Sequence, residues 1–210
     1  MTSSARESLA LREPMITLRR ANQRRHVRLG QREAWLTFYP QAPLARSFGA
    51  LESLNEDRLS PGARGPQQLH QDSEIVSYVL EGALAHEDSM GHSGVTHSGE
   101  FHRMTAGRGI SHSEANASPT EWLRVFQIRL HPSIAGLEPS YERKRFSAAE
   151  RRGLLRVVAS PDGRKGSLLV HQDVLIYSAL LDPGQHLVHE LVEGRSAWLH
   201  VVQGLSLIHI

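Results

Sequence analysis

Between residues 74 and 129, short apolar runs alternate with turn-forming residues, and this spacing limits the fold more than any other feature of the sequence. Turns are expected at four places: Gly82, 89–92, 98–99 and 117–119. Segment 122–130 alternates apolar and polar residues, so we predict a strand that ends before Pro132. Strands repeated at this spacing are typical of an all-β barrel or sandwich. The sequence therefore predicts an all-β fold.

Two pairs of polar residues carry the candidate chemistry: Gln68 with His70, and His112 with Glu114. The members of each pair are two positions apart, so on a strand they point to the same face. If both strands line one barrel, all four side chains project into its lumen. Two imidazoles, a carboxylate and an amide are suitable ligands for one divalent transition metal.

Composition excludes several other classes of protein. The 210 residues include no cysteine, which rules out disulfides and thiolate metal sites and fits a reducing compartment. The formal net charge is +2, from 24 Lys+Arg against 22 Asp+Glu, and this balance argues against nucleic-acid binding. No apolar run is long enough to span a bilayer and no signal peptide opens the chain. A cytoplasmic protein without a membrane partner is expected.

The spacing of the polar pairs resembles a known family. Gly62-x5-Gln68-x-His70-x3-Glu74-x7-Gly82 resembles the first cupin motif, with Gln68 in place of its first His, and 99–116 resembles the second. The finer resemblance is to the pirins, bicupin proteins that include bacterial quercetin 2,3-dioxygenases. Strings that are near-identical to pirin strings lie at 78–82, 86–91, 99–101, 104–110, 159–162, 166–168 and 170–173. The resemblance covers roughly residues 15–204.

This resemblance implies an all-β bicupin built from double-stranded β-helix (cupin) barrels. We expect a disordered extension at 1–14, an N-terminal cupin domain with the metal site at 15–130, a linker at 131–153 and a partial C-terminal cupin domain at 154–204. The second barrel is expected to be truncated at its C-terminus. The closing 205–210 matches the translation of a sequencing-library adapter, so we hypothesise that this tail is not native.

The second half is predicted to be structural. Strands are expected near 154–159, 167–175, 176–181, 186–191 and 197–202. A short helix is predicted at 147–152, with Ser147 as its N-cap. No His-x-His or His-x-Ser-Glu pattern recurs there, so the second cupin is predicted to bind no metal.

In pirins, three His and one Glu hold the metal, and the resemblance assigns these roles by position. His70, His112 and Glu114 match, whereas Gln68 stands where the first His belongs. Imidazole suits Fe(II) and Cu(II) better than an amide does, so Gln68 is at most a weak fourth ligand or a partner of a metal-bound water. The remaining two His and one carboxylate form a triad that leaves positions open for dioxygen and substrate. Glu74 is a reserve ligand.

The expected cofactor is one divalent transition metal, first Fe(II), with Cu, Ni, Mn and Zn as alternatives. The competing interpretation makes His70 and His112 hydrogen-bonded barrel residues without a metal. The remaining histidines considered are expected to be structural or exposed: His86, His97, His102, His171 and His200.

The implied activity is quercetin 2,3-dioxygenase-like cleavage of a flavonol by O2. Glu114 would be both a ligand and the catalytic base that takes the substrate's hydroxyl proton. An apolar lumen would accept the planar substrate, and its candidate lining is Val76, Tyr78, Phe101, Met104 and Phe126. Trp35, Phe38 and Tyr39 are expected to pack in the core rather than touch the ligand.

Two other functions remain open. The chain is alternatively a non-catalytic pirin that acts as a regulatory protein-binding module with a degenerate metal site, an interpretation that Gln68 favours. A cupin enzyme of another kind, such as a small-molecule isomerase, is a third possibility for which the sequence selects no substrate.

Overall fold

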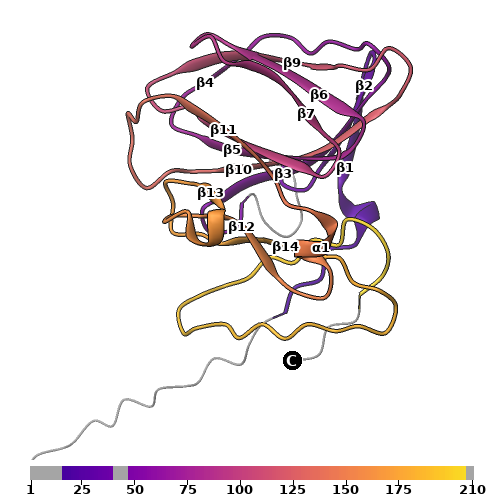
Figure 1. Ribbon diagram of the computed structural model, residues 1–210, viewed down its shortest axis with the longest axis vertical. Helices are drawn as coiled ribbons and strands as arrows, with labels where there is room; N and C mark the ends of the chain where they lie inside the picture. The colour runs from indigo at the N-terminus through magenta and orange to yellow at the C-terminus, as the bar shows by residue number, and fades with distance from the viewer. Residues whose placement is uncertain (1–15, 40–46, 207–210) are drawn as a thin grey trace, which may run out of the picture.

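A computed structural model describes residues 16–39 and 47–206 of the chain. Two antiparallel sheets face each other, and a small third sheet lies against the outer face of the larger one (Figure 1). The predicted extension at 1–14 and the last four residues of the predicted tail lie outside the described residues. The all-β prediction is confirmed, because strands dominate and the helices are short.

The larger sheet has seven antiparallel strands. In spatial order they are β1 (Arg25–Leu29), β2 (Arg32–Leu36), β3 (Leu51–Leu59), β10 (Leu123–Leu130), β5 (Glu74–Glu81), β8 (Glu100–Thr105) and β11 (Ser140–Arg145). The predicted strand at 122–130 is therefore confirmed as β10, at the centre of this sheet. A 3-10 turn, η1 (Ala21–Gln23), precedes β1.

The facing sheet has four antiparallel strands. In spatial order they are β4 (Gln68–His70), β9 (Ile110–Asn116), β6 (Ala83–Asp88) and β7 (Ser93–His97). Gly82 connects β5 of one sheet to β6 of the other at a φ of +77°, as its predicted turn requires. A Cβ there would lie 2.5 Å from the carbonyl oxygen of Trp122, so only glycine fits.

The strands of the larger sheet bury side chains on both faces. Met104 packs with Ile75, Ala106 and Ile110, and because Ile110 belongs to the facing sheet, this cluster lies between the sheets. A second cluster between the sheets joins Val79 and Leu123 to Leu84 of β6. Apolar packing thus closes the interior of the sandwich around its polar centre.

The predicted apolar lining is wrong for four of its five members. Val76 and Phe101 pack against the second half, with Tyr78 beside them, and Phe126 contacts the ring of His200 at 5.6 Å. Alternation along a strand explains this result: Ser77 and His102 point between the sheets, so their neighbours point away. Met104 alone faces inward.

The second half forms a three-stranded sheet in the order β13-β12-β14. Its elements are α1 (Ala148–Arg151), β12 (Arg156–Ser160), η2 (Arg164–Gly166), β13 (Leu168–Leu169) and β14 (Ile176–Ser178). The predicted N-cap is confirmed, since Ser147 Oγ accepts a hydrogen bond from the Glu150 backbone N–H. Part of the expected linker forms β11, which the sequence did not predict.

The strands predicted at 186–191 and 197–202 are wrong: neither segment forms regular structure in the described part of the chain. Both run through the long loop at the bottom of Figure 1. Val188 and Leu199 remain 79% and 62% exposed, so strand-forming residues here lack a sheet to bury them. Strand propensity reflects packing on a half-buried surface, and without that surface it has no effect.

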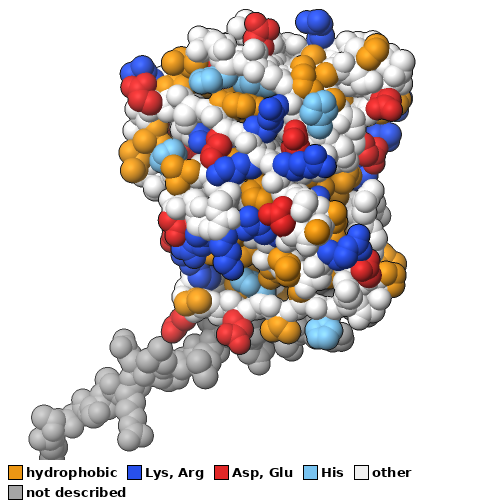
Figure 2. Space-filling view, in the orientation of Figure 1, with side chains coloured by type: hydrophobic (Ala, Val, Ile, Leu, Met, Phe, Trp, Pro, Cys, Tyr) orange, Lys and Arg blue, Asp and Glu red, His pale blue; other side chains and the backbone are white. Residues whose placement is uncertain are grey.

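The surface carries mixed charge. On the face shown in Figure 2, basic and acidic side chains lie side by side, in keeping with the net charge of +2. None of the helices in the described residues has the length and apolar composition needed to cross a membrane. Of the predicted core aromatics, Phe38 is buried and packs against Trp198, and Trp35 stacks on His26.

Candidate metal centre

The four residues of the predicted ligand set lie on neighbouring strands of the smaller sheet. In the antiparallel pairing of β4 with β9, Gln68 is directly opposite His112, and His70 is opposite Ile110. Directly paired residues share a face, so Gln68, His70 and His112 project the same way. The rings of His70 and His112 are 5.0 Å apart. The strands thus bring the predicted set together, while its role in binding a metal stays a prediction.

Glu114 joins this set from the same strand, and β6 adds a further histidine beside it. His86 is directly opposite Glu114 in the pairing of β6 with β9. The ring of His86 lies 5.3 Å from that of His112. His102 reaches the same place from β8 in the facing sheet, with its ring 5.8 Å from that of His86.

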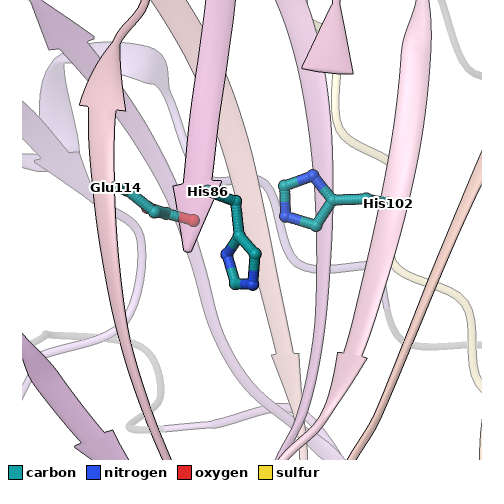
Figure 3. A group of neighbouring side chains, drawn as sticks. All are labelled: His86, His102 and Glu114. Carbon is teal, nitrogen blue, oxygen red and sulfur yellow. The ribbon is translucent and has the colours of Figure 1, made fainter. Parts of the chain in front are cut away.

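His86, His102 and Glu114 form a compact group of possible metal ligands. Each offers one ligand atom, and these atoms lie within 4.8 Å of one another. In Figure 3 the Glu114 carboxylate and the His102 ring approach His86 from opposite sides. The sequence placed both histidines among the structural or exposed ones, yet they are 3% and 1% exposed and lie at the site.

Each of these three side chains is fixed by a hydrogen bond at one of its two polar atoms. His86 Nε2 lies 3.2 Å from Asp88 Oδ2, and His102 Nδ1 lies 3.0 Å from Thr96 Oγ1. Glu114 Oε2 accepts a hydrogen bond of 2.7 Å from Gln127 Nε2. Tyr141 of β11 stacks on the His86 ring at 4.9 Å and completes the wall of the site.

Other polar atoms at the site are buried without a partner in the described residues. They are His86 Nδ1, both ring nitrogens of His112 and Glu114 Oε1. A buried polar group without a hydrogen bond costs about 1–3 kcal/mol. A neutral imidazole offers one lone pair, and a carboxylate oxygen offers another. A cation bound to one nitrogen of each ring and to Glu114 Oε1 would remove most of this cost, so the donor set fits a metal.

Burial also sets the protonation of the site. It lowers the pKa of His102 to about 3 and that of His112 to about 4, with repulsion between the neighbouring histidines acting the same way. Burial lowers the pKa of His70 too, and Arg129 adds to the shift. These imidazoles are therefore neutral at neutral pH, which is the form that binds metals.

Glu114 responds to burial in the opposite direction. Although the residue is half-buried as a whole, its Oε1 has no contact with solvent. Burial raises the pKa of this carboxyl to about 7, and the hydrogen bond from Gln127 opposes the shift. A nearby cation would restore the charged form.

The geometry bears on two further sequence-based expectations. Glu74, the reserve ligand, points away from the site and binds His171 Nδ1 at 3.0 Å and Thr105 Oγ1 at 3.1 Å. Among the described residues, neither ring nitrogen of His112 has a hydrogen-bond partner, which does not support the alternative in which His70 and His112 are hydrogen-bonded barrel residues without a metal; that alternative stays open.

Comparison with known proteins identifies both halves of the chain. A family model described as "Pirin" matches residues 20–130, and one described as "Quercetinase C-terminal cupin domain" matches residues 157–209. The bicupin expectation agrees with these two matches.

Several relatives match most of the chain. A protein of Escherichia coli named "Quercetin 2,3-dioxygenase" is 42% identical over 193 residues, which are 90% of this chain and 82% of that protein. A "Pirin-like protein" of Caulobacter vibrioides is 34% identical over 164 residues, 78% of this chain and 70% of the relative.

Solved structures also match this chain. The crystal structure of YhhW from Escherichia coli matches with a TM-score of 0.73 at 43% identity, covering 78% of this chain and 70% of YhhW. A second structure, described as the bacterial pirin YhhW in complex with nickel(II), matches with a TM-score of 0.72 at 42% identity and the same coverage.

Proposed function

This chain belongs to the pirin family, and from that premise we propose that it is a metal-dependent dioxygenase that cleaves flavonols such as quercetin. The names of its relatives support the reaction class, and the nickel(II) complex of YhhW supports a divalent metal. The observation that carries the proposal is the group of buried imidazole and carboxyl atoms on β9 and the neighbouring β6 that have no hydrogen-bond partner within the described part of the chain.

We assign the ion to the set predicted from sequence. His70, His112 and Glu114 bind it, and Gln68 gives a weak fourth contact or holds a bound water. The pairing of Gln68 with His112 and the 5.0 Å separation of the His70 and His112 rings support this set. Fe(II) is the first candidate from the ligand chemistry, and nickel is the metal bound in a relative.

The metal supplies Lewis acidity and a template for the substrate and dioxygen. The chain itself handles the proton. Glu114 would take the proton of the flavonol hydroxyl, and its Oε1, which has no hydrogen-bond partner among the described residues, is the oxygen available for it. Gln127 holds the other oxygen of the carboxylate and so fixes the direction of Oε1.

The substrate's aromatic rings need an apolar contact near these groups. Ile110, opposite His70 in the β4–β9 pairing, packs with Met104 and Ile75 between the sheets. We propose this cluster as the apolar floor under the flavonol, in place of the four residues that face the second half.

Oxygen consumption and loss of flavonol absorbance in the Fe(II)- or Ni(II)-loaded protein test this function. We expect the unaltered chain to turn over quercetin. In His112→Ala the turnover rate should fall roughly a hundred-fold or more, because the substitution removes a metal ligand next to Glu114. His97→Ala is the matched control, since His97 is exposed at the end of β7. Absence of turnover with one equivalent of bound metal contradicts the proposal.

One observation favours a second function. Gln68 replaces a ligand that pirins carry, as a degenerate site in a regulatory protein-binding module would. A protein that binds metal but turns over no flavonol or O2 would support this alternative.

A further inference from the structure

The outer face of the larger sheet carries a pocket that is separate from the metal centre. This outer pocket is a cavity of about 350 Å³, lined by Arg24, Trp35, Glu56, Arg58, Glu81 and Arg124. Gln127 of β10 points between the sheets, where it donates a hydrogen bond to Glu114. Its neighbour Phe126 therefore points outward, and the Arg124 guanidinium lies 5.7 Å over that ring. The outer pocket thus opens on the opposite side of β10 from the predicted ligand set.

Glu56 fixes two of the arginines that line the outer pocket. Its Oε2 accepts a hydrogen bond of 2.8 Å from Arg24 Nη1, and its Oε1 accepts one of 2.6 Å from Arg124 Nε. Burial opposes the charge of Glu56, but the hydrogen bonds from Arg24 and Arg124 outweigh it and hold the pKa of this carboxyl below its usual range. Both arginines are therefore held in place by one buried, charged carboxylate.

Arg58 is the arginine of the outer pocket whose charge is not matched. Its guanidinium lies 5.5 Å over the ring of Trp122, and within the described part of the chain its Nε is buried without a hydrogen-bond partner. Glu33 lies directly opposite Arg58 on β2, but its carboxylate pairs with Arg28. On β10, Arg58 is directly opposite Arg124, and like charges at such positions destabilise a sheet. An anion between the two guanidinium groups would offset this repulsion.

Charge and shape indicate the class of ligand. Three arginines and two glutamates give the lining a net charge of +1, which suits a monoanion better than a phosphate group. The planar guanidinium group matches the two oxygens of a carboxylate. Trp35, directly opposite Glu56, adds an aromatic surface, and His26 stacks on its indole at 4.6 Å and so orients it.

We propose that the outer pocket binds a small aromatic carboxylate, with the carboxylate between Arg58 and Arg124 and the ring against Trp35. The volume of the cavity is in the range of small-molecule sites. This binding site goes beyond the proposed function, because it uses none of the predicted metal ligands and lies on the other face of the larger sheet.

Calorimetric titration of the unaltered chain with benzoate tests the outer pocket. We expect saturable binding of one equivalent of benzoate. Acetate, which lacks the ring, and benzamide, which lacks the charge, should each bind about ten-fold more weakly or less tightly still. Inorganic phosphate should also bind more weakly than benzoate. Absence of saturable benzoate binding overturns the proposal, as does an equal or higher affinity for acetate or for phosphate.

Single variants locate the bound benzoate. Arg58→Gln should weaken benzoate binding about ten-fold or more, because it removes the unmatched charge. Trp35→Leu should weaken it about 2–10-fold, through the loss of the aromatic contact. Arg108→Gln is the matched control, since Arg108 is exposed and lies outside the outer pocket. Thermal melting without benzoate reports whether each variant folds, and unchanged benzoate affinity in a folded Arg58→Gln variant overturns the proposal.

His112→Ala separates the outer pocket from the metal centre, because carboxylates also bind metal ions. Benzoate affinity should be the same in His112→Ala as in the unaltered chain. Binding that is lost in His112→Ala and kept in Arg58→Gln would place benzoate at the metal centre and overturn the outer pocket. Failure of flavonol turnover leaves this inference untouched, and failure of benzoate binding leaves the proposed function untouched.

A direct measurement needs no variant. Crystals of the unaltered chain soaked with para-iodobenzoate should give an anomalous iodine peak beside Trp35, with the carboxylate between Arg58 and Arg124. An iodine peak elsewhere, or none at all, contradicts the proposal.

Discussion

The two halves of this chain use their buried space differently. Between its sheets the first half encloses buried histidines and other polar side chains around Glu114, beside two apolar clusters. The second half contributes apolar side chains, Phe146, Val158 and Leu168, to a cluster against the outer face of the larger sheet. A polar interior is costly unless its groups find partners, so such an interior marks the functional half. The second half stabilises the first half by packing against the outer face of its larger sheet.

The sharpest test of this division removes apolar packing from the second half. Leu168 is fully buried, whereas its neighbour Leu169 is 38% exposed. Leu168→Ala should lower the free energy of unfolding by about 2–5 kcal/mol, because it leaves a cavity behind β8, while Leu169→Ala should cost less than about 0.5 kcal/mol. Urea unfolding followed by tryptophan fluorescence measures both.

Nickel(II) binding by Leu168→Ala shows whether the second half affects only stability or also the metal site. At a temperature where Leu168→Ala is folded, its nickel(II) stoichiometry should equal that of the unaltered chain, because Leu168 lies outside the sandwich interior. Loss of metal in a folded Leu168→Ala variant would show that the second half shapes the site rather than only supporting it.

A smaller effect is expected at the polar contact between the halves. Glu74 is fully buried and accepts from Thr105 Oγ1 and from the ring of His171 in the second half. Glu74→Gln puts an amide N–H against one of these donors and should destabilise the protein by about 1–3 kcal/mol. A double-mutant cycle with His171→Ala should give a coupling of about 0.5–3 kcal/mol.

The same variant tests a ligand role for Glu74. Because its carboxylate points to the second half, Glu74→Gln should bind nickel(II) as the unaltered chain does. A tenfold weaker nickel(II) affinity in Glu74→Gln would indicate that Glu74 is a metal ligand. The polar interior of the first half and the apolar cluster of the second half would then not be functionally separate.

Several of these features could be predicted from local patterns. The two-residue spacing of Gln68 with His70, and of His112 with Glu114, fixes the face that each pair shares, whatever the rest of the fold does. The turn at Gly82 and the cap at Ser147 depend on local backbone chemistry, and both are found as expected.

The sequence-based predictions that are wrong depend on contacts between strands that are distant in the sequence. The strands β5 and β8 are buried on both faces, so alternation gave no sign of whether Phe101 or His102 points inward. The approach of His102 to Glu114 depends on how the two sheets stack, which no spacing along the chain encodes. Segments 186–191 and 197–202 have strand-like sequences, but a strand also needs a paired neighbour.

The smallest predicted effect concerns His200, where the second half touches the first. Its ring meets Phe126 edge-on at 5.6 Å, and burial lowers its pKa from 6.5 to about 4, with Arg24 acting in the same direction and Glu56 opposing. The unfolded chain takes up a proton below pH 6.5 that the folded chain takes up only near pH 4. The free energy of unfolding therefore falls as the pH drops through this window, and His200 contributes no slope above it.

Melting curves of the unaltered chain and of His200→Gln at about pH 7.5 and about pH 4.5 isolate this contribution, since the other buried histidines titrate in both proteins. The acid-induced fall in melting temperature should be smaller in His200→Gln. Because the ring is half-buried, the difference should stay well below the limit of about 1.4 kcal/mol per pH unit for one proton. Equal falls in both proteins would mean that His200 is solvated in the folded state.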